Sequence, residues 1–150
     1  MSQTLRLSVL LFGVVLIASQ TLAQRRPKDK ILDRRVFVVT MEQQSDRKNK
    51  LEPFEEELSF RSNRMSSKHM RSQAGGGFML GDYAVSKVEK VMDENVIHFQ
   101  AINKNQKGMS LKWEGKVFGG RVEGTAIVSK KGKIKQEFVF SGALKQKKKR

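Results

Sequence analysis

Apolar and polar residues alternate along most of this chain. From Val36 onward the alternation has a period of two far more often than 3.6, and clusters of Gly, Asn, Asp and Ser separate the alternating runs. This pattern predicts an all-β, antiparallel protein. The expected strands are Arg35–Glu42, Glu56–Arg61, Arg64–Ser67, Gly81–Val91, Val96–Asn103, Met109–Val117, Arg121–Ser129 and Ile134–Leu144. We expect a charged loop over 43–54 and a helical turn within 66–80, before three consecutive glycines.

One hairpin can be predicted down to its register. Gly119 and Gly120 stand between two alternating runs, and a two-residue turn with positive φ at both positions suits Gly-Gly. The facing pairs are then Val117–Val122, Gly115–Gly124, Trp113–Ala126 and Leu111–Val128 on one face, and Lys116–Glu123 on the other. Apolar residues face apolar residues and opposite charges meet. A one-residue slip would exchange the two faces, so the match supports this register.

The following hairpin is expected to keep the inward side of the sheet apolar. A three-residue loop, Lys130-Lys131-Gly132, satisfies this requirement when Gly132 adopts the left-handed conformation. The expected facing pairs are Ala126–Gln136, Gly124–Phe138 and Val122–Phe140. Large side chains would then lie over small ones.

An earlier hairpin completes the pattern. Ile97, Phe99 and Ala101 share a face, and the segment 104–108 turns the chain back to Met109 and Leu111. Three consecutive hairpins make a meander. About seven or eight strands of this length are expected to close into a small barrel, because closure removes the exposed edges.

The run from Leu111 to Leu144 resembles the C-terminal meander of small exported bacterial lipocalin-like, or calycin-type, β-barrel proteins. The residues that carry the resemblance are Trp113-Glu114-Gly115, Gly120, Gly124-Thr125 and Phe140-Ser141-Gly142. The chain departs from true lipocalins in lacking a Gly-x-Trp in the first strand and the usual cysteine pair. The resemblance implies a cup that holds a small hydrophobic molecule and performs no chemistry on it.

The N-terminus has the layout of a cleavable signal peptide. Arg6 precedes an apolar run of 12 residues, Leu7–Ala18, whereas a helix that crosses a bilayer needs about 20. Thr21 and Ala23 are the small residues that signal peptidase requires, so we expect cleavage before Gln24, with no transmembrane span after processing. The chain has no cysteine and no Asn-x-Ser/Thr site, which favours a secreted or periplasmic bacterial protein.

The charge is strongly positive, +15 over the whole chain. Basic residues gather at both ends of the expected domain, which spans 33–144. The runs 24–32 and 145–150 are expected to be mobile basic tails, because like charges repel one another. The candidate residues for binding polyanions are Arg25, Arg26, Lys145, Lys147, Lys148, Lys149 and Arg150.

Five residues are candidates for lining a ligand cavity inside the barrel: Trp113, Gln136, Tyr83, Phe99 and Phe138. Trp113 either lines a cavity or packs in a filled core, and eight-stranded barrels are often filled. A buried Gln136 amide requires a partner, either the Trp113 indole, a water or a ligand. Tyr83 is placed at the barrel mouth or at a strand end with its hydroxyl in water.

Other polar residues do not form a reactive constellation. His69 and His98 are isolated, and zinc requires three or four ligands. Glu55, Glu56 and Glu57 are consecutive, so they cannot all point inward, and catalytic carboxylates need burial or a charged partner. The three glycines at 75–77 lack the Lys-Ser/Thr that completes a phosphate-binding loop. We therefore expect no metal, no cofactor and no enzymatic activity.

Two functions remain in competition. The first is binding of a small hydrophobic or amphipathic molecule in the interior; the alternative is binding of acidic envelope polymers or an anionic membrane surface through the Lys/Arg tails. A specific nucleic-acid partner is not expected, because the aromatic side chains that would stack on bases are few and mostly inward.

Overall fold

The computed structural model describes residues 28–45, 48 and 50–148. The predicted signal peptide, Arg25, Arg26, Lys149 and Arg150 lie outside the described residues. Eight strands and one short helix make up the fold: β1 Val36–Gln43, β2 Phe54–Arg61, β3 Arg64–Ser67, α1 Lys68–Arg71, β4 Gly81–Val91, β5 Glu94–Lys104, β6 Met109–Phe118, β7 Arg121–Lys130 and β8 Lys133–Leu144. Every predicted strand is present, with its bounds shifted by two residues at most.

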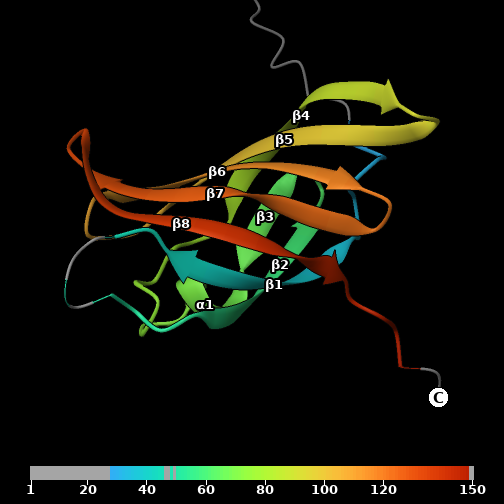
Figure 1. The fold of residues 1–150 in the computed structure, drawn as a ribbon. Coiled ribbons are helices and arrows are strands. Elements are labelled where there is room, and N and C mark those ends of the chain that lie inside the picture. The colour runs from blue at the N-terminus through green and yellow to red at the C-terminus, as the bar shows by residue number, and fades with distance from the viewer. Residues whose placement is uncertain (1–27, 46–47, 49, 149–150) are drawn as a thin grey trace, which may run out of the picture.

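The strands form one antiparallel meander that closes on itself. Each strand pairs with the next along the chain, and β8 pairs with β1, so that the hydrogen bonds run round a ring (Figure 1). The ring has one weak seam. There β3 and β4 pair only at Arg64–Asp82 and Met65–Gly81. The predicted meander and closure are therefore confirmed in this coarser form, because the ring is too irregular to be called a barrel.

The predicted register of β6 and β7 is confirmed. Trp113 lies opposite Ala126, and Gly115 lies opposite Gly124. Gly119 and Gly120 form the turn, with φ of 53° and 76°. On the outer face Lys116 Nζ lies 3.0 Å from Glu123 Oε1, as the charge pattern predicted.

The predicted register of β7 and β8 is wrong by two residues. Ala126 lies opposite Phe138 rather than Gln136, and the turn contains two residues, Lys131 and Gly132, instead of three. Lys131 adopts positive φ, 51°, in addition to Gly132 at 75°. A bulge at Lys135 adds one residue to β8 and restores the inward position of Phe138.

Large rings lie over the two facing strand glycines in the core. A Cβ atom on Gly115 would come within 2.6 Å of Phe99 Cζ, and one on Gly124 within 2.8 Å of Phe140 Cζ. The prediction that large side chains cover these glycines is confirmed, although the rings are Phe99 and Phe140 and not Phe138. Interior space at this level is occupied by aromatic side chains.

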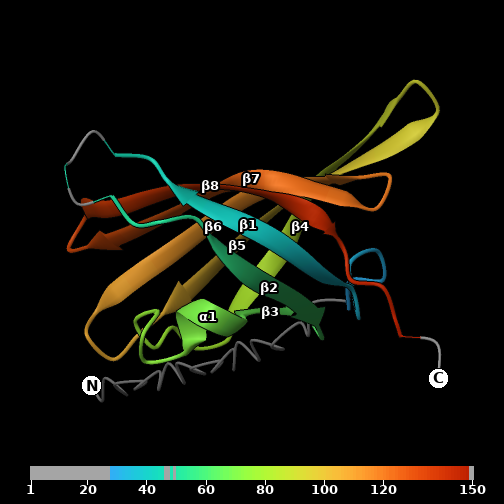
Figure 2. The ribbon, with the colours of Figure 1, turned by 60° about the horizontal axis from the view of Figure 1, so that its bottom comes forward.

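The ring has two different ends. At the helix end lie α1, the β1–β2 loop and the β5–β6 and β7–β8 turns; at the terminal end lie the start of β1, the end of β8, and the β2–β3 and β6–β7 turns (Figures 1 and 2). The β4–β5 hairpin extends beyond the terminal end (Figure 2). No helix among the described residues is long and apolar enough to span a membrane.

The residues just before β1 pack on the fold. Leu32 is fully buried, and the Asp29 amide donates to Asn63 Oδ1 at 2.7 Å. Residues 29–32 thus belong to the domain and not to a tail, which corrects the expected boundary at residue 32. Burial of Leu32 and the hydrogen bonds of Asp29 outweigh the charge repulsion that predicted a mobile segment.

Candidate functional site

Four of the five candidate cavity residues are buried in the core. Trp113, Phe99, Phe138 and Tyr83 are at most 4% exposed. Phe60 packs edge to face against Tyr83 and Phe99, with ring centroids 4.9 and 5.1 Å apart. Gln136 is half-buried on β8 and lies opposite Val128, so the structure does not bring it into the layer of Trp113.

The partner of the Trp113 indole is Asn103. The indole N–H donates to Asn103 Oδ1 at 2.8 Å, and the Asn103 amide group donates to the carbonyls of Met65 and Met79 at 3.0 and 2.8 Å. Asn103 continues the inward positions of Phe99 and Ala101, so the same alternation could have identified it. Among the described residues, no buried side-chain nitrogen or oxygen lacks a hydrogen-bond partner.

Glu56 is buried at the helix end and holds α1 in place. Only 1% of it is exposed, and its carboxylate accepts from the Ser67 hydroxyl at 2.6 Å and from the amides of His69 and Met70 at 2.8 and 3.0 Å. The expectation that Glu55, Glu56 and Glu57 cannot all point inward holds, yet one of them does. The alternation with Leu58 and Phe60 is the signal that could have identified Glu56.

The Tyr83 hydroxyl is tied to the N-terminal segment. It donates to Asp29 Oδ2 at 2.7 Å, and Asp29 also accepts from the amides of Ile31 and Leu32 at 2.9 and 2.8 Å. Burial acts to raise the pKa of Asp29, but the hydrogen bonds from Tyr83 and the backbone outweigh it and hold this pKa below its usual value. Burial, and then the hydrogen bond to Asp29, raise the pKa of Tyr83.

Neither histidine joins a cluster of potential metal ligands. His98 Nε2 lies 2.8 Å from Glu89 Oε1, and Lys87 Nζ lies 2.7 Å from the other oxygen of the same carboxylate. The hydrogen bonds from Lys87 and His98 lower the pKa of Glu89. The His69 ring packs against Phe54 with centroids 4.6 Å apart. In the described part of the chain no three His, Asp or Glu residues gather as metal ligands would.

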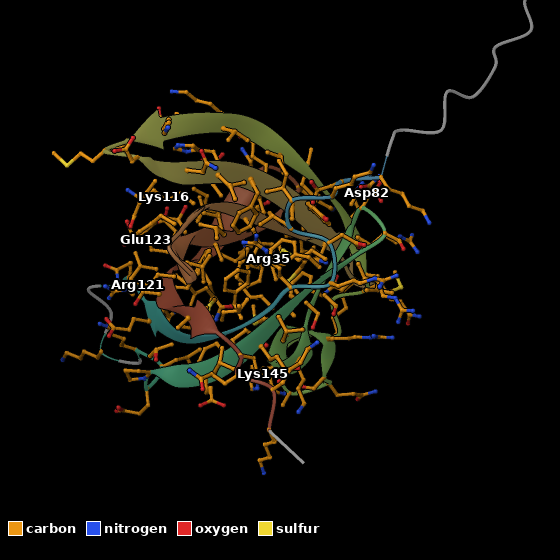
Figure 3. The ribbon with its side chains drawn as sticks, turned by 90° about the vertical axis from the view of Figure 1, so that its right-hand side faces the viewer. Arg35, Asp82, Lys116, Arg121, Glu123 and Lys145 are labelled. Carbon is orange, nitrogen blue, oxygen red and sulfur yellow. The ribbon has the colours of Figure 1, made fainter. Side chains whose placement is uncertain are left out.

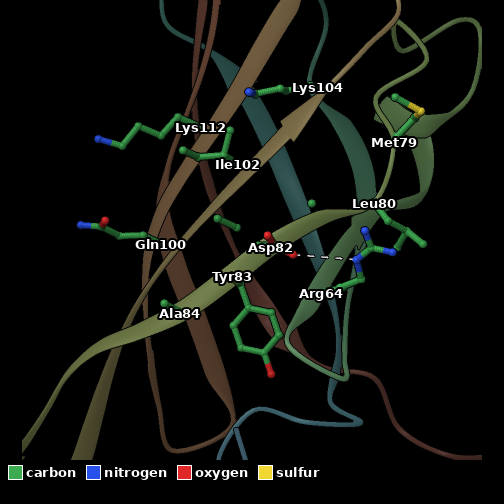
Figure 4. Close-up of a pocket in the computed structure, with 12 residues that line it drawn as sticks. Arg64, Met79, Leu80, Asp82, Tyr83, Ala84, Gln100, Ile102, Lys104 and Lys112 are labelled. Atoms are coloured by element: carbon green, nitrogen blue, oxygen red, sulfur yellow. Dashed lines mark ion pairs between the residues drawn. The ribbon is translucent and has the colours of Figure 1, made fainter. Parts of the chain in front are cut away.

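A groove of about 490 Å³ lies on the outer face of β4, β5 and β6 (Figure 4). Exposed Met79, Leu80 and Ile102 contribute apolar surface, and Lys104 and Lys112 lie at one side. Asp82 and Arg64, both in its lining, form a loose ion pair, with 3.8 Å between Oδ1 and Nε. Tyr83 belongs to its lining, whereas Trp113, Gln136, Phe99 and Phe138 do not.

A second cleft of about 490 Å³ lies at the terminal end, where the start of β1 meets the end of β8. We call it the terminal cleft. Five cations and two apolar side chains line most of it. Its residues are Arg34, Arg35, Val36, Leu144, Lys145, Gln146, Lys147 and Lys148. Figure 3 looks onto this end, with Arg35 near the centre and Arg121 and Lys145 farther out.

Most cations of the terminal end lack an acidic partner. Lys145 Nζ lies 2.8 Å from Glu57 Oε2, and Arg34 forms only a loose pair with Asp33 at 3.8 Å. No carboxylate within the described ranges pairs with Arg35, Arg121, Lys147 or Lys148. The cleft thus presents uncompensated positive charge beside exposed Leu144.

Three of the predicted polyanion-binding residues, Lys145, Lys147 and Lys148, belong to the terminal cleft. Sequence reasoning missed Arg34, Arg35 and Arg121. Ring closure places Arg34 and Arg35 in the cleft, because β8 pairs with β1. Arg121 lies at the same end, opposite Ala143, because β7 pairs with β8. The runs of charge visible in the sequence could not show that arrangement.

No known family model matches this chain, and no curated protein or solved structure is significantly similar to it. The resemblance to lipocalin-like proteins is therefore supported as far as an all-β antiparallel meander that closes into a ring, and membership of that family stays a prediction.

Proposed function

We propose that this protein binds an anionic membrane surface with its terminal end. The observation that carries the proposal is the terminal cleft, which the cations Arg34, Arg35, Lys145, Lys147 and Lys148 line together with the apolar residues Val36 and Leu144. Anionic headgroups attract the cations, and acyl chains accept the apolar surface next to them. An acidic polymer would use the charges alone.

The interior receives less support as a binding site. Its candidate aromatic residues pack against one another, and Asn103 already occupies the indole N–H of Trp113. Interior binding of a small apolar molecule stays a prediction, and among the described residues no buried side-chain nitrogen or oxygen is left without a partner to orient such a ligand.

Charge alone does not select the terminal end, because the helix end is basic as well. Lys130, Lys133 and Lys135 are exposed on the β7–β8 hairpin there, and no carboxylate among the described residues pairs with them. The difference lies in shape, because the cations of the terminal end line a cleft together with Val36 and Leu144. A test of the proposal must therefore compare equal losses of charge at the two ends.

The test is co-sedimentation with vesicles of phosphatidylglycerol and phosphatidylcholine, using protein produced from the full chain in an exporting host. Replacing Arg121, Lys147 and Lys148 by Ser should weaken binding roughly 100-fold, from about 1 kcal/mol per charge at the surface. The matched control replaces Lys130, Lys133 and Lys135 by Ser and should have a much smaller effect. Binding should disappear near ~1 M salt, where the screening length is about 3 Å.

Two results would contradict the proposal. Equal weakening by both triple variants would mean that binding has no preferred face. Binding to soluble polyglutamate but not to the anionic vesicles would identify an acidic polymer as the partner.

A further inference from the structure

The β4–β5 hairpin reaches beyond the rest of the ring. On one side β6 pairs with β5 only from Ile97 onward, and on the other β3 pairs with β4 only at Gly81 and Asp82. Residues 87–96, which we call the projecting hairpin, therefore have a neighbouring strand on neither side in the described structure. A two-stranded ribbon of this kind gains little from burial, so its exposed side chains need another explanation.

The tip of the projecting hairpin is apolar. Met92 occupies the first turn position, with φ of 48° and 96% of its surface exposed. Val91 precedes it at 49% exposed, and Val88 lies farther back at 47%. Met92 is thus far more exposed than the other large apolar residues of the described chain, and it lies at the most prominent point of the hairpin.

The tip and the terminal cleft face the same direction. In Figures 1 and 2 the β4–β5 turn and the C-terminal segment after Leu144 both extend to the same side of the molecule, with the β6–β7 turn between them. A flat surface that approaches this side meets both. The surface that attracts the cations of the cleft would therefore also meet Met92.

We infer that the projecting hairpin inserts its tip, Val91 and Met92, into the membrane when the terminal end docks. This inference rests on the proposed function. Insertion must be shallow, because the turn has backbone groups that need water or headgroups as partners. Asp93 and Glu94 follow Met92 directly, and Asp93 pairs with Lys90 at 3.5 Å, so the charged residues stay at headgroup level.

Electrostatics at the tip explain why the hairpin alone would not be enough. Lys87 and Lys90 are outnumbered by Glu89, Asp93 and Glu94, so the projecting hairpin has no net positive charge. The attraction must come from the terminal cleft, and the hairpin supplies apolar contact after arrival. Because a soluble polyanion offers no apolar contact to the hairpin, we expect the protein to prefer a lipid surface.

The first experiment places a reporter at the tip. Val91→Trp puts an indole at a strand position that favours aromatic residues, while Trp113 remains fully buried as an internal reference. We expect a blue shift and quenching of the new indole by vesicles with brominated acyl chains. The unsubstituted protein, with Trp113 alone, should show neither change.

The second experiment removes the apolar tip without changing charge. Met92→Asn suits the positive φ at this position and should weaken partition into anionic vesicles about tenfold, the effect of losing roughly one buried apolar side chain. The matched control is Ile134→Asn, because Ile134 is 59% exposed beside the turn at the helix end. It should leave partition unchanged, and both variants should keep the melting temperature.

The possible outcomes distinguish a failure of tip insertion from a failure of membrane binding as a whole. If the unsubstituted protein binds anionic vesicles but the Val91→Trp indole is not quenched and Met92→Asn binds equally well, the inference is wrong and the proposed function stands. If the unsubstituted protein does not bind vesicles at all, the proposed function fails and the inference with it. If Met92→Asn converts a dimer into a monomer by light scattering, the tip contacts a second copy and not a membrane.

Discussion

The two ends of the ring differ in how far their charged side chains are paired within the fold. At the helix end, buried Glu56 accepts three hydrogen bonds from Ser67 and α1. At the terminal end, Arg35 and Arg121 have no carboxylate partner within the described residues. Both ends are rich in lysine or arginine, yet among the described residues only the terminal end has an apolar tip as exposed as Met92.

This difference shows that the net charge of a region does not say whether its charged groups are available to bind a partner. A buried carboxylate whose oxygens already accept hydrogen bonds from within the fold contributes to stability and is not available to a partner. Unpaired cations around apolar side chains contribute little to stability and are available for binding. The following predictions test whether stability depends on the helix end and binding on the terminal end.

The largest loss of stability is expected for Glu56→Ala. The Ser67 hydroxyl and the amides of His69 and Met70 would lose their shared acceptor, at a cost of roughly 3 to 5 kcal/mol. Urea denaturation measures this free energy. Glu55→Ala is the matched control, because Glu55 is exposed and should change it by less than about 0.5 kcal/mol. Similar losses for both variants would show that Glu56 does not support this end.

Asn103→Leu should destabilise the protein by about 2 to 4 kcal/mol, since it leaves the Trp113 indole and the Met65 and Met79 carbonyls without their partner. Trp113→Phe removes the same indole donor. In a double-mutant cycle the two changes should be coupled by about 1 to 2 kcal/mol. Additive effects would mean that the hydrogen bond between these side chains does not matter.

The two turns that flank β7 should respond in opposite directions. Gly120→Val places a β-branched residue at a φ of 76° and should cost about 1 to 2 kcal/mol. Lys131→Gly relieves a non-glycine residue at positive φ and should stabilise by about 0.5 kcal/mol. Thermal unfolding of both variants provides the comparison. A loss of stability for Lys131→Gly would contradict the two-residue turn.

The smallest effect is expected for the Asp29–Tyr83 contact, and it should depend on pH. The pKa of Asp29 is lowered by folding, so its contribution is present above its unfolded pKa of about 4 and is lost as the pH falls. The pKa of Tyr83 is raised, so its contribution is present below about 10 and is lost as the pH rises beyond that. Asp29→Asn should cost about 1 kcal/mol at pH 7 and progressively less as the pH falls below about 4. A cost that does not vary with pH would show that the carboxylate is not the relevant acceptor.

The sequence predicts the strand register where alternating apolar and polar residues flank a turn whose position is unambiguous. The β6–β7 register follows from Gly119-Gly120 and from the opposite charges of Lys116 and Glu123, and it is confirmed. The β7–β8 register does not follow, because a bulge at Lys135 changes the parity within the strand and Lys131 accepts positive φ. Bulges depend on local tertiary packing, which alternation does not encode.

The candidate site divides in the same way. Lys145, Lys147 and Lys148 are visible as a run of like charge and belong to the terminal cleft. Arg34 and Arg35 join them only because β1 pairs with β8 and closes the ring. Arg121 lies at the same end because β7 pairs with β8. The inward position of Trp113 follows from the alternation, but its hydrogen-bond partner is Asn103 and not Gln136. Single residues can be assigned to a face from sequence; neighbours across a closed sheet need the topology.

The seam between β3 and β4 sets the order in which this ring should open. Two register pairs and the hydrogen bond from the Tyr83 amide to the Asn63 carbonyl join these strands, whereas β7 and β8 pair along their whole length. Separating β3 from β4 breaks few contacts. It turns the closed ring into an open eight-stranded sheet that keeps the other seven strand pairings. Amide hydrogens at the seam should therefore exchange with solvent through a sub-global opening, ahead of those in β6 and β7, whose exchange should require global unfolding.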